Sequence, residues 1–226
     1  MSAPLEDPVL SALGIAHGFG QRGSGVPDET VFPRQMHGTA VLYAEAEGVL
    51  SGEAVADVVV SEQAGISVGI VTADCVPILL ASERGATVGA IHAGWRGLAA
   101  GVIEAGLAAL RARAGGEEIY CAVGPAARGC CYEVDPPVRD GLLERHASLL
   151  GEVLVPSGSC HFQLDLGLLA CRVLERGGLT VAQIGTRNLE CSICDPLRFD
   201  SYRREGAAAG RMKHFITGSG TTCHWG

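Results

Sequence analysis

Short apolar segments bounded by glycine, proline or polar residues recur along the chain. Val and Ile are frequent in these segments, and each is short for a helix, so they predict buried strands. The expected strands cover residues 40–43, 57–61, 66–71, 77–81, 87–92, 119–123, 180–184 and 211–217.

Apolar residues recur at helical spacing in longer segments, which predict helices over residues 97–113, 137–150 and 164–175. The first should end at Gly115-Gly116, the second should begin at Pro137 and end before Gly151, and Gly177-Gly178 should stop the third. Residues 1–30 are punctuated by glycine and should be rich in loops. Because strands and helices intermix and no linker divides the chain, we expect an α/β or α+β layered fold with mixed β-sheets packed against helices, as a single compact domain over residues 1–226.

Composition narrows the class of protein. The 226 residues are 47% hydrophobic and 19% charged, which indicates a buried globular core. The net charge of −8 argues against a nucleic acid or an anionic membrane as partner, but local arginines can still bind a small phosphorylated substrate. No targeting pattern and no apolar run of about 20 residues is present. Nine cysteines in a chain of this kind indicate reduced thiols in a cytoplasmic enzyme.

Three residues with metal-binding side chains lie at the ends of apolar segments. His37 precedes one, Cys75 follows a second, and His92 ends a third, just before a glycine-spaced turn and a predicted helix start. We therefore expect these three side chains to converge. A catalytic zinc site takes three protein ligands of these types and leaves a fourth position open. Their spacing matches no local zinc signature, and a buried structural cysteine or a hydrogen-bonded histidine would fit the same positions.

The residues around these positions resemble the signature blocks of the laccase-domain family. The blocks are Arg34-Gln35-Met36-His37-Gly38, Thr72-Ala73-Asp74-Cys75-Val76-Pro77-Ile78-Leu79 and His92-Ala93-Gly94-Trp95-Arg96-Gly97. Supporting blocks follow at Cys131-Tyr132-Glu133-Val134 and at Ser201-Tyr202-Arg203-Arg204-Glu205-Gly206. Members of this family, once called polyphenol oxidases, are better described as purine nucleoside phosphorylases with adenosine deaminase activity. The resemblance implies a fold similar to that of cysteine hydrolases and a zinc site made of His37, Cys75 and His92.

The resemblance also implies a chemistry for the neighbouring residues. Members cleave adenosine, inosine and methylthioadenosine with phosphate, and they deaminate adenosine. Asp74 would orient a ligand or move a proton. The turn from Gly94 to Gly97 and the Arg96 side chain would bind phosphate. Further candidates for contacts with substrate or phosphate are Arg34, Gln35, Arg203 and Arg211.

Other functions remain open on the sequence alone. In a metal-free cysteine hydrolase, such as an amidase that edits peptidoglycan precursors, Cys75 would be the nucleophile and His92 its base. A non-catalytic zinc-binding protein would use the same three residues. Copper oxidase chemistry is disfavoured, because the chain has seven histidines and no His-x-His pair, and Met36 is poorly placed as an axial ligand.

The remaining cysteines show one Cys-x-x-Cys motif. It is formed by Cys191 and Cys194, and other thiols occur as Cys130-Cys131, Cys160-His161 and Cys223-His224. Because these pairs are scattered along the sequence, we expect incidental thiols and no structural zinc site.

Overall fold

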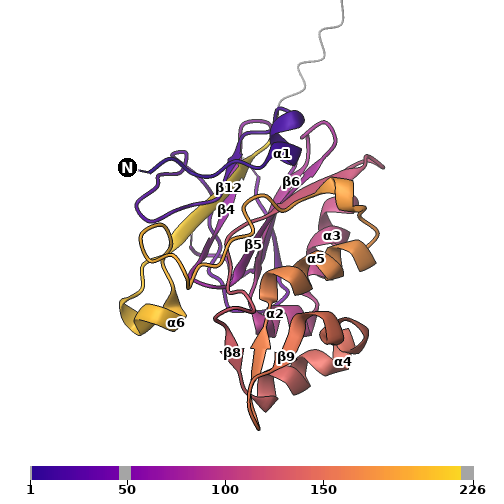
Figure 1. Cartoon of the computed structure of the whole chain (residues 1–226). Helices are drawn as coiled ribbons and strands as arrows, with labels where there is room; N and C mark the ends of the chain where they lie inside the picture. The colour runs from indigo at the N-terminus through magenta and orange to yellow at the C-terminus, as the bar shows by residue number, and fades with distance from the viewer. Residues whose placement is uncertain (1, 46–51, 220–226) are drawn as a thin grey trace, which may run out of the picture.

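A six-stranded mixed sheet forms the centre of the molecule, as seen in a computed structural model that describes residues 2–45 and 52–219. Its strands are β2 (Val41–Tyr43), β3 (Val58–Ser61), β5 (Val76–Ser82), β6 (Val88–Ala93), β7 (Ile119–Val123) and β11 (Ile184–Gly185). They lie in the order β11-β7-β5-β6-β3-β2. The two central strands, β5 and β6, are labelled in Figure 1. The four inner strands pair antiparallel, whereas β11 and β2 each pair parallel to their neighbour at the two edges.

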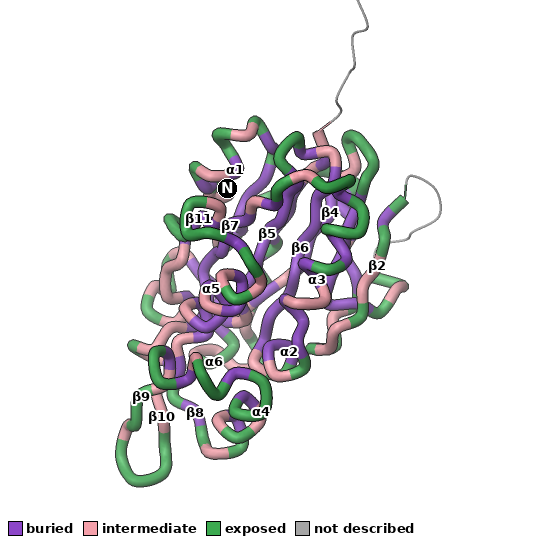
Figure 2. The backbone as a smooth tube through the Cα atoms, turned by 90° about the vertical axis from the view of Figure 1, so that its right-hand side faces the viewer, coloured by how far each residue is buried: buried purple, intermediate pink, exposed green. Residues whose placement is uncertain are grey.

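Helices cover one face of this sheet and a second sheet covers the other. The helices on the sheet are α2 (Trp95–Ala100), α3 (Val102–Arg111) and α5 (Leu166–Arg176), and α4 (Pro136–Val153) packs against α2 and α5. The second sheet has the order β1-β12-β4 and is built from β1 (His17–Gly18), β12 (Met212–Thr217) and β4 (Ser67–Thr72). The central strands are buried while the outer elements carry the exposed residues (Figure 2).

The alternation of side chains along the central strands produces two separate cores. Val58 and Val60 of β3 pack in the core that faces the helices, and Val59 between them packs in the core that faces the second sheet. The same alternation places Ile78 on the helix side of β5 and Leu79 on the other side. Because both faces of the sheet are covered, its strands have continuous apolar sequences instead of a polar alternation.

Smaller elements complete the structure. A three-stranded sheet near α4 has the order β8-β10-β9 and consists of β8 (Glu133–Val134), β10 (Phe162–Leu164) and β9 (Leu154–Pro156) (Figure 1). The short helices are α1 (Pro8–Ala12), α6 (Tyr202–Glu205) and the 3₁₀ turns η1 (Val181–Gln183) and η2 (Gly206–Ala208). No helix among the described residues is long and apolar enough to cross a membrane.

The predicted fold class, helices packed with mixed sheets, is confirmed. Most predicted strands are present within one or two residues of their expected ends, and the strand at 119–123 is reproduced fully. The predicted strand at 180–184 is wrong for its first residues, which form η1 because Thr180 and Gln183 make a reciprocal capping box. Residues 1–30 contain more order than expected, since they include α1 and β1.

The predicted helices need three corrections. The helix expected over 97–113 is two helices, α2 and α3, separated by Gly101 in the left-handed region at φ 96°. Gly151 lies inside α4 and not beyond its end. Residue Leu164 ends β10, and α5 starts later because the Asp165 side chain caps it by accepting a hydrogen bond from the Leu168 N–H.

The break at Gly101 gives a test of the fold. We expect Gly101→Ala to lower the free energy of unfolding by about 1–2 kcal/mol, because a residue with a Cβ pays that cost in the left-handed region. Gly151→Ala is the matched control, since it lies in a helix, is exposed and has no atom within 4 Å of the added methyl group. The control should be neutral or stabilising by up to about 1 kcal/mol. Urea unfolding of both variants measures the difference, and equal effects would contradict the assignment.

Candidate metal centre and active-site cavity

The structure brings His37, Cys75 and His92 together at one end of the central sheet. His37 lies in the loop before β2, Cys75 directly precedes β5, and His92 lies near the end of β6. Their ligand atoms all lie within 4.8 Å of one another, with 3.8 Å between Cys75 Sγ and His37 Nε2. The two imidazole rings meet edge to face, with centroids 4.8 Å apart.

The backbone at this site is held in an unusual conformation. Among the described residues, three that are not glycine have positive φ, and two of them, His37 at 60° and Asp74 at 90°, belong to the site. Such conformations cost of order 1–3 kcal/mol each and persist only where surrounding contacts impose them. Local contacts must therefore fix the loops that carry His37 and Cys75.

For the His37 loop, that contact is the buried carboxylate of Asp57. It accepts hydrogen bonds from three successive N–H groups, those of Met36 (3.1 Å), His37 (2.9 Å) and Gly38 (2.7 Å). It also lies 2.7 Å from Nδ1 of His92. Successive backbone N–H groups around a left-handed residue form an anion-binding nest. Asp57 therefore positions two of the three candidate ligands from a side chain that is 1% exposed.

Asp57 was not among the predicted site residues, because it appeared only as the first residue of an expected strand. The signal that could have revealed it is an acidic side chain joined directly to the fully buried run Val58–Ser61. A carboxylate in such a place requires strong hydrogen-bond donors. The sequence does not indicate which donors these are.

The contact with Asp57 sets the state of His92. Nδ1 donates to the carboxylate, which leaves Nε2 as the atom available to a ligand. Burial opposes the charged form of His92, but hydrogen bonds with Asp57 and Cys75 outweigh it and raise the pKa of His92 to about 9. Burial likewise opposes ionisation of Cys75, yet hydrogen bonds with His37 and His92 lower the pKa of this thiol to about 6. The metal-free site thus favours a thiolate beside an imidazolium.

The donor set suits a metal ion of the zinc type. Two imidazole nitrogens and one thiolate are three protein ligands, which is the number found in catalytic zinc sites with an open fourth position. Gly94 allows the close approach, because a Cβ there would lie 2.9 Å from Cys75 Sγ and 2.9 Å from His37 Cδ2. Any larger residue at position 94 would displace two of the three ligands.

The three ligands open into a cavity of about 720 Å³. This volume lies within the range of about 300–1,000 Å³ typical of small-molecule sites. All of the residues predicted from the sequence for catalysis, metal binding or substrate contact line it, namely Arg34, Gln35, His37, Asp74, Cys75, His92, Arg96, Arg203 and Arg211. Aromatic side chains that were not predicted as site residues also line it, namely Trp95, Tyr132 and Tyr202.

Asp74 fixes one wall of this cavity. Its carboxylate accepts hydrogen bonds from Ser192 Oγ (2.7 Å), Ser201 Oγ (3.0 Å) and the Arg203 N–H (2.7 Å). These contacts tie the loop before Cys75 to α6 and the segment preceding it. They give Asp74 a positioning role, and its predicted part in catalysis stays a prediction.

Three of the cavity arginines lie against aromatic rings. Arg96 lies over Trp95 at 4.4 Å, Arg203 over Tyr132 at 4.6 Å and Arg211 over Tyr202 at 6.0 Å. Stacking on a ring restricts each guanidinium while leaving its other face accessible. The cavity therefore presents positive charge and aromatic surface side by side.

Gln35 and Arg34 have clear structural contacts. The Gln35 amide donates to the Val71 carbonyl and accepts from the Val71 N–H, at 2.8 and 2.7 Å. Arg34 pairs through its backbone with residues 54 and 56. Both residues anchor the His37 loop, and their predicted contacts with substrate stay predictions.

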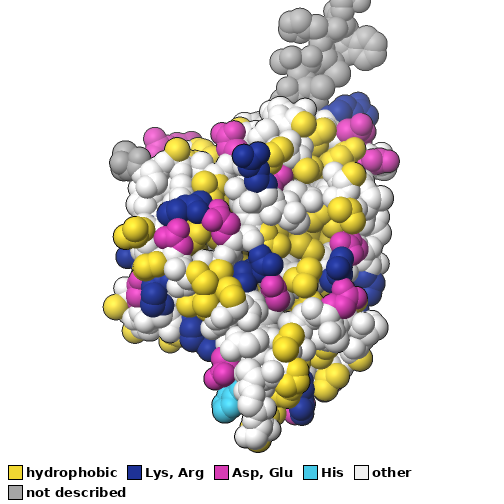
Figure 3. All heavy atoms as spheres, viewed as in Figure 1, with side chains coloured by type: hydrophobic (Ala, Val, Ile, Leu, Met, Phe, Trp, Pro, Cys, Tyr) yellow, Lys and Arg dark blue, Asp and Glu magenta, His cyan; other side chains and the backbone are white. Residues whose placement is uncertain are grey.

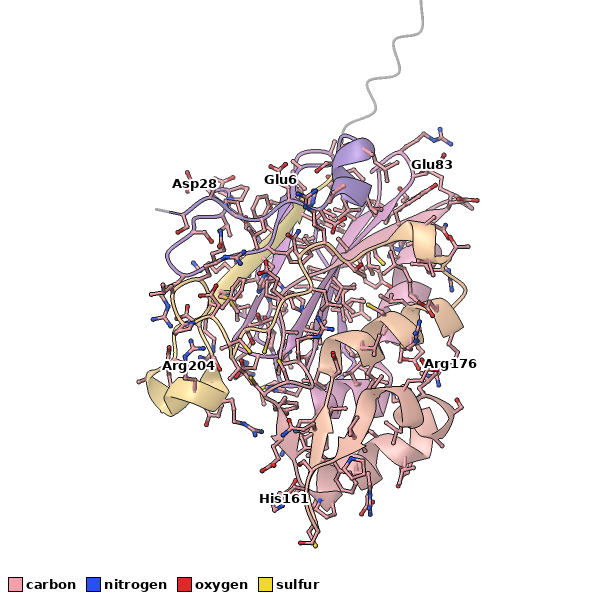
Figure 4. The ribbon with its side chains drawn as sticks, viewed as in Figure 1. Glu6, Asp28, Glu83, His161, Arg176 and Arg204 are labelled. Carbon is pink, nitrogen blue, oxygen red and sulfur yellow. The ribbon has the colours of Figure 1, made fainter. Side chains whose placement is uncertain are left out.

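The positions of four cysteines contradict the prediction that these thiols are scattered. Cys130, Cys131, Cys191 and Cys194, expected to be scattered thiols, form a second cluster in which the four Sγ atoms lie within 4.8 Å of one another. Cys160 is exposed in the segment between β9 and β10 and belongs to neither cluster. The adjacent His161 lies at the lower end of the molecule in Figure 4. The pair Cys223-His224 lies outside the described residues.

The outer surface shown in Figure 3 carries basic and acidic side chains interspersed. Several of these charges form ion pairs, such as Arg22 with Asp200 and Arg172 with Glu152. The expectation that neither nucleic acid nor a membrane is a partner stays a prediction.

Comparison with known proteins places the chain in a family. Residues 19–219 match the family model described as multi-copper polyphenol oxidoreductase laccase. A purine nucleoside phosphorylase of Xylella fastidiosa is 38% identical over 184 residues, which are 80% of this chain and 69% of the relative. Adenosine deaminase RL5, from an unknown prokaryotic organism, is 32% identical over 195 residues, 81% of this chain and 73% of the relative.

A solved structure agrees with these matches. The crystal structure of YlmD from Geobacillus stearothermophilus superposes with a TM-score of 0.75 at 30% identity, covering 85% of this chain and 74% of that one. The resemblance seen in the signature blocks is thereby confirmed, and the chain belongs to the family described as multi-copper polyphenol oxidoreductase laccase.

Proposed function

We propose that the protein is a zinc-dependent purine nucleoside phosphorylase. It cleaves adenosine, inosine and methylthioadenosine with phosphate to give the free base and a ribose 1-phosphate, and it also deaminates adenosine. The observation that carries this proposal is the His37–Cys75–His92 donor set opening into a cavity lined by arginines and aromatic rings. Relatives named purine nucleoside phosphorylase and adenosine deaminase support the same choice.

The donor set favours zinc over the copper of the family's description. Among the described residues, two groups of His, Cys, Asp and Glu are close enough to hold a metal, and the group in the cavity has only two histidines. A multicopper centre needs several more imidazoles. The other buried histidines are bound to protein groups, His17 to Asp7 and Ile15, His146 to Leu98 and Arg176, and His214 to Thr72 and Gly20.

The cavity residues suit a nucleoside and phosphate. Trp95, Tyr132 and Tyr202 offer aromatic faces against which a purine can stack. Guanidinium groups bind phosphate through charge-assisted, often bidentate hydrogen bonds. A zinc ion in the site would supply Lewis-acid activation of water or of a substrate oxygen. Asp57 holds the proton at Nδ1 of His92, so the ring presents Nε2 to the cavity throughout.

A cysteine hydrolase is the second candidate, and one observation favours it. The lowered pKa of Cys75 and its contact with His92 are the features of an activated thiol nucleophile. The same thiolate is what a metal ligand requires. The two functions therefore share their residues and differ in whether a metal occupies the site during turnover.

Turnover and metal content separate these candidates. Protein purified without added metal should contain zinc, and Cys75→Ala and His92→Ala should each lower its zinc content by about one ion per chain. It should release hypoxanthine from inosine only when phosphate is present, and ammonia from adenosine. Chelation should abolish both reactions and zinc should restore them. Activity that survives chelation but is lost on thiol alkylation would rule out the metalloenzyme and favour metal-free catalysis by Cys75. Bound zinc without any turnover would leave only a binding protein.

Asp57→Asn tests the positioning of the ligands. An amide cannot accept from all four donors, so the His37 loop and the His92 ring should both lose their constraint. Loss of such a supporting carboxylate typically costs about 10–100-fold in metal affinity or activity. We expect a fall of that size in zinc affinity, measured by competition with a chromogenic chelator. Asp140→Asn is the control, because Asp140 is exposed and, among the described residues, its side chain pairs only with the adjacent Arg139. If the zinc affinity of Asp57→Asn were unchanged, the positioning role assigned to Asp57 would be wrong.

Arg96→Ala tests the phosphate contact. Removing a hydrogen bond to a charged group costs about 1.5–3 kcal/mol, or roughly 10–150-fold in kcat/KM for phosphate. Deamination of adenosine uses no phosphate and should fall much less. Arg84→Ala, on the surface and away from the cavity, should change neither reaction. Equal losses in phosphorolysis and deamination would refute a phosphate-specific role for Arg96.

A further inference from the structure

Two cysteine pairs from distant parts of the chain meet outside the active-site ligands. Cys130 and Cys131 lie in the loop between β7 and β8, and Cys191 and Cys194 lie between β11 and α6. The Sγ atom of Cys194 is 3.0 Å from that of Cys131 and 3.5 Å from that of Cys130, across 63 and 64 residues of sequence. All four Sγ atoms lie within 4.8 Å of one another.

This spacing suits four sulfur ligands around one ion. Zinc–sulfur bonds of about 2.3 Å in a tetrahedron place the sulfur atoms about 3.8 Å apart. Cys-x-x-Cys is the usual half-site of a structural zinc centre, and Cys191 and Cys194 provide it. The adjacent pair Cys130-Cys131 supplies the other two sulfurs. Cys130 and Cys194 are exposed, so an ion can reach the cluster from solvent.

The surrounding backbone holds the two segments in register. Ala126 pairs with Cys191 as an isolated parallel bridge. In this bridge the Ala126 N–H donates to the Glu190 carbonyl, and the Ser192 N–H donates to the Ala126 carbonyl, both at 3.0 Å. The Cys131 N–H donates to the Arg128 carbonyl at 3.0 Å, which closes the turn that presents the adjacent pair. The cluster is therefore positioned by contacts that do not depend on the thiols.

Hydrogen-bond donors surround this part of the cluster. Backbone N–H groups of Arg128, Cys194 and Ile193 donate to the Cys191 sulfur. The Arg204 guanidinium donates to the carbonyls of Ser192 and Ile193, at 3.0 and 2.8 Å, and so places positive charge on the Cys-x-x-Cys loop. Arg204 belongs to α6 and is labelled in Figure 4.

We propose that Cys130, Cys131, Cys191 and Cys194 form a second metal site, a tetrathiolate centre that binds Zn²⁺ and has a structural role. On binding, each thiol gives its proton to solvent and its sulfur lone pair to the ion, with no change in oxidation state. The resulting centre carries about two negative charges, which the neighbouring backbone N–H groups and Arg204 offset.

The place of this centre in the fold indicates what it stabilises. Cys131 directly precedes Tyr132, which lines the active-site cavity. Between Cys191 and Cys194, Ser192 donates to the Asp74 carboxylate next to Cys75. A metal joining the two cysteine pairs would therefore fasten the loop that carries Tyr132 to the loop that holds Asp74, and both of these residues line the cavity. The proposal of a tetrathiolate site does not depend on the proposed phosphorylase activity.

Metal content in a variant without the active-site ligands tests the proposal. Cys75→Ala/His92→Ala, purified with a reductant and desalted, should retain about one zinc ion per chain by elemental analysis, because the tetrathiolate set is intact. Adding Cys191→Ser and Cys194→Ser to this variant should remove that ion. Adding Cys160→Ser instead is the matched control and should not, since Cys160 lies outside the cluster.

Cobalt provides a second readout that needs no cluster variant. Co²⁺ added to the apo form of Cys75→Ala/His92→Ala should give the intense visible absorption of a tetrahedral tetrathiolate, and Zn²⁺ should displace it. Absence of both zinc and this spectrum would overturn the proposal, as would zinc retained after loss of Cys191 and Cys194. Mass spectrometry showing a disulfide between the pairs in the reduced preparation would also overturn it.

Discussion

The buried carboxylate of Asp57 is the constraint on which the candidate metal centre depends. Hydrogen bonds to a charged acceptor contribute about 1.5–3 kcal/mol each, and Asp57 accepts three from the His37 loop. Together these exceed the cost of about 1–3 kcal/mol for the left-handed conformation of His37. The fourth bond, to Nδ1 of His92, couples the same carboxylate to a strand of the central sheet. One side chain thus sets the distance between the His37 loop and a strand of the central sheet.

Asp74 performs the corresponding task on the opposite wall. Its carboxylate binds Ser192, Ser201 and the backbone of Arg203, and its own carbonyl accepts from the Ala127 N–H at 2.8 Å. Both acidic residues lie close to the end of a strand. Their carboxylate oxygens accept hydrogen bonds from loops that are not paired with the sheet. Because each carboxylate fixes the loops on its own side, the site can lie among irregular segments and still have a defined geometry. The strands supply rigidity, and the two carboxylates transmit it to the loops.

The sequence predicts the parts of this arrangement that rest on local pattern. Continuous apolar runs located the central strands because those strands are buried on both faces. His37, Cys75 and His92 stood out because each lies at the end of such a run and matches a family block. Asp57 did not stand out, since its importance comes from donors 19 to 35 residues away. The cysteine cluster was missed for the same reason, because its pairs meet only after β7 and β11 come to lie side by side.

The break between α2 and α3 was missed in the sequence for a different reason. Apolar spacing continues from α2 into α3, so periodicity alone favours one helix, and only the φ of Gly101 reveals two. The break keeps α2 short, and its N-terminal Gly94 lies against Cys75 and His37. A residue without a side chain is required there because the ligands approach its Cα closely. The same turn brings Trp95 and Arg96 to the cavity, so one glycine position serves both the candidate metal ligands and the cavity wall. The geometry of the candidate ligands and the shape of the cavity are consequently linked through the backbone that joins β6 to α2.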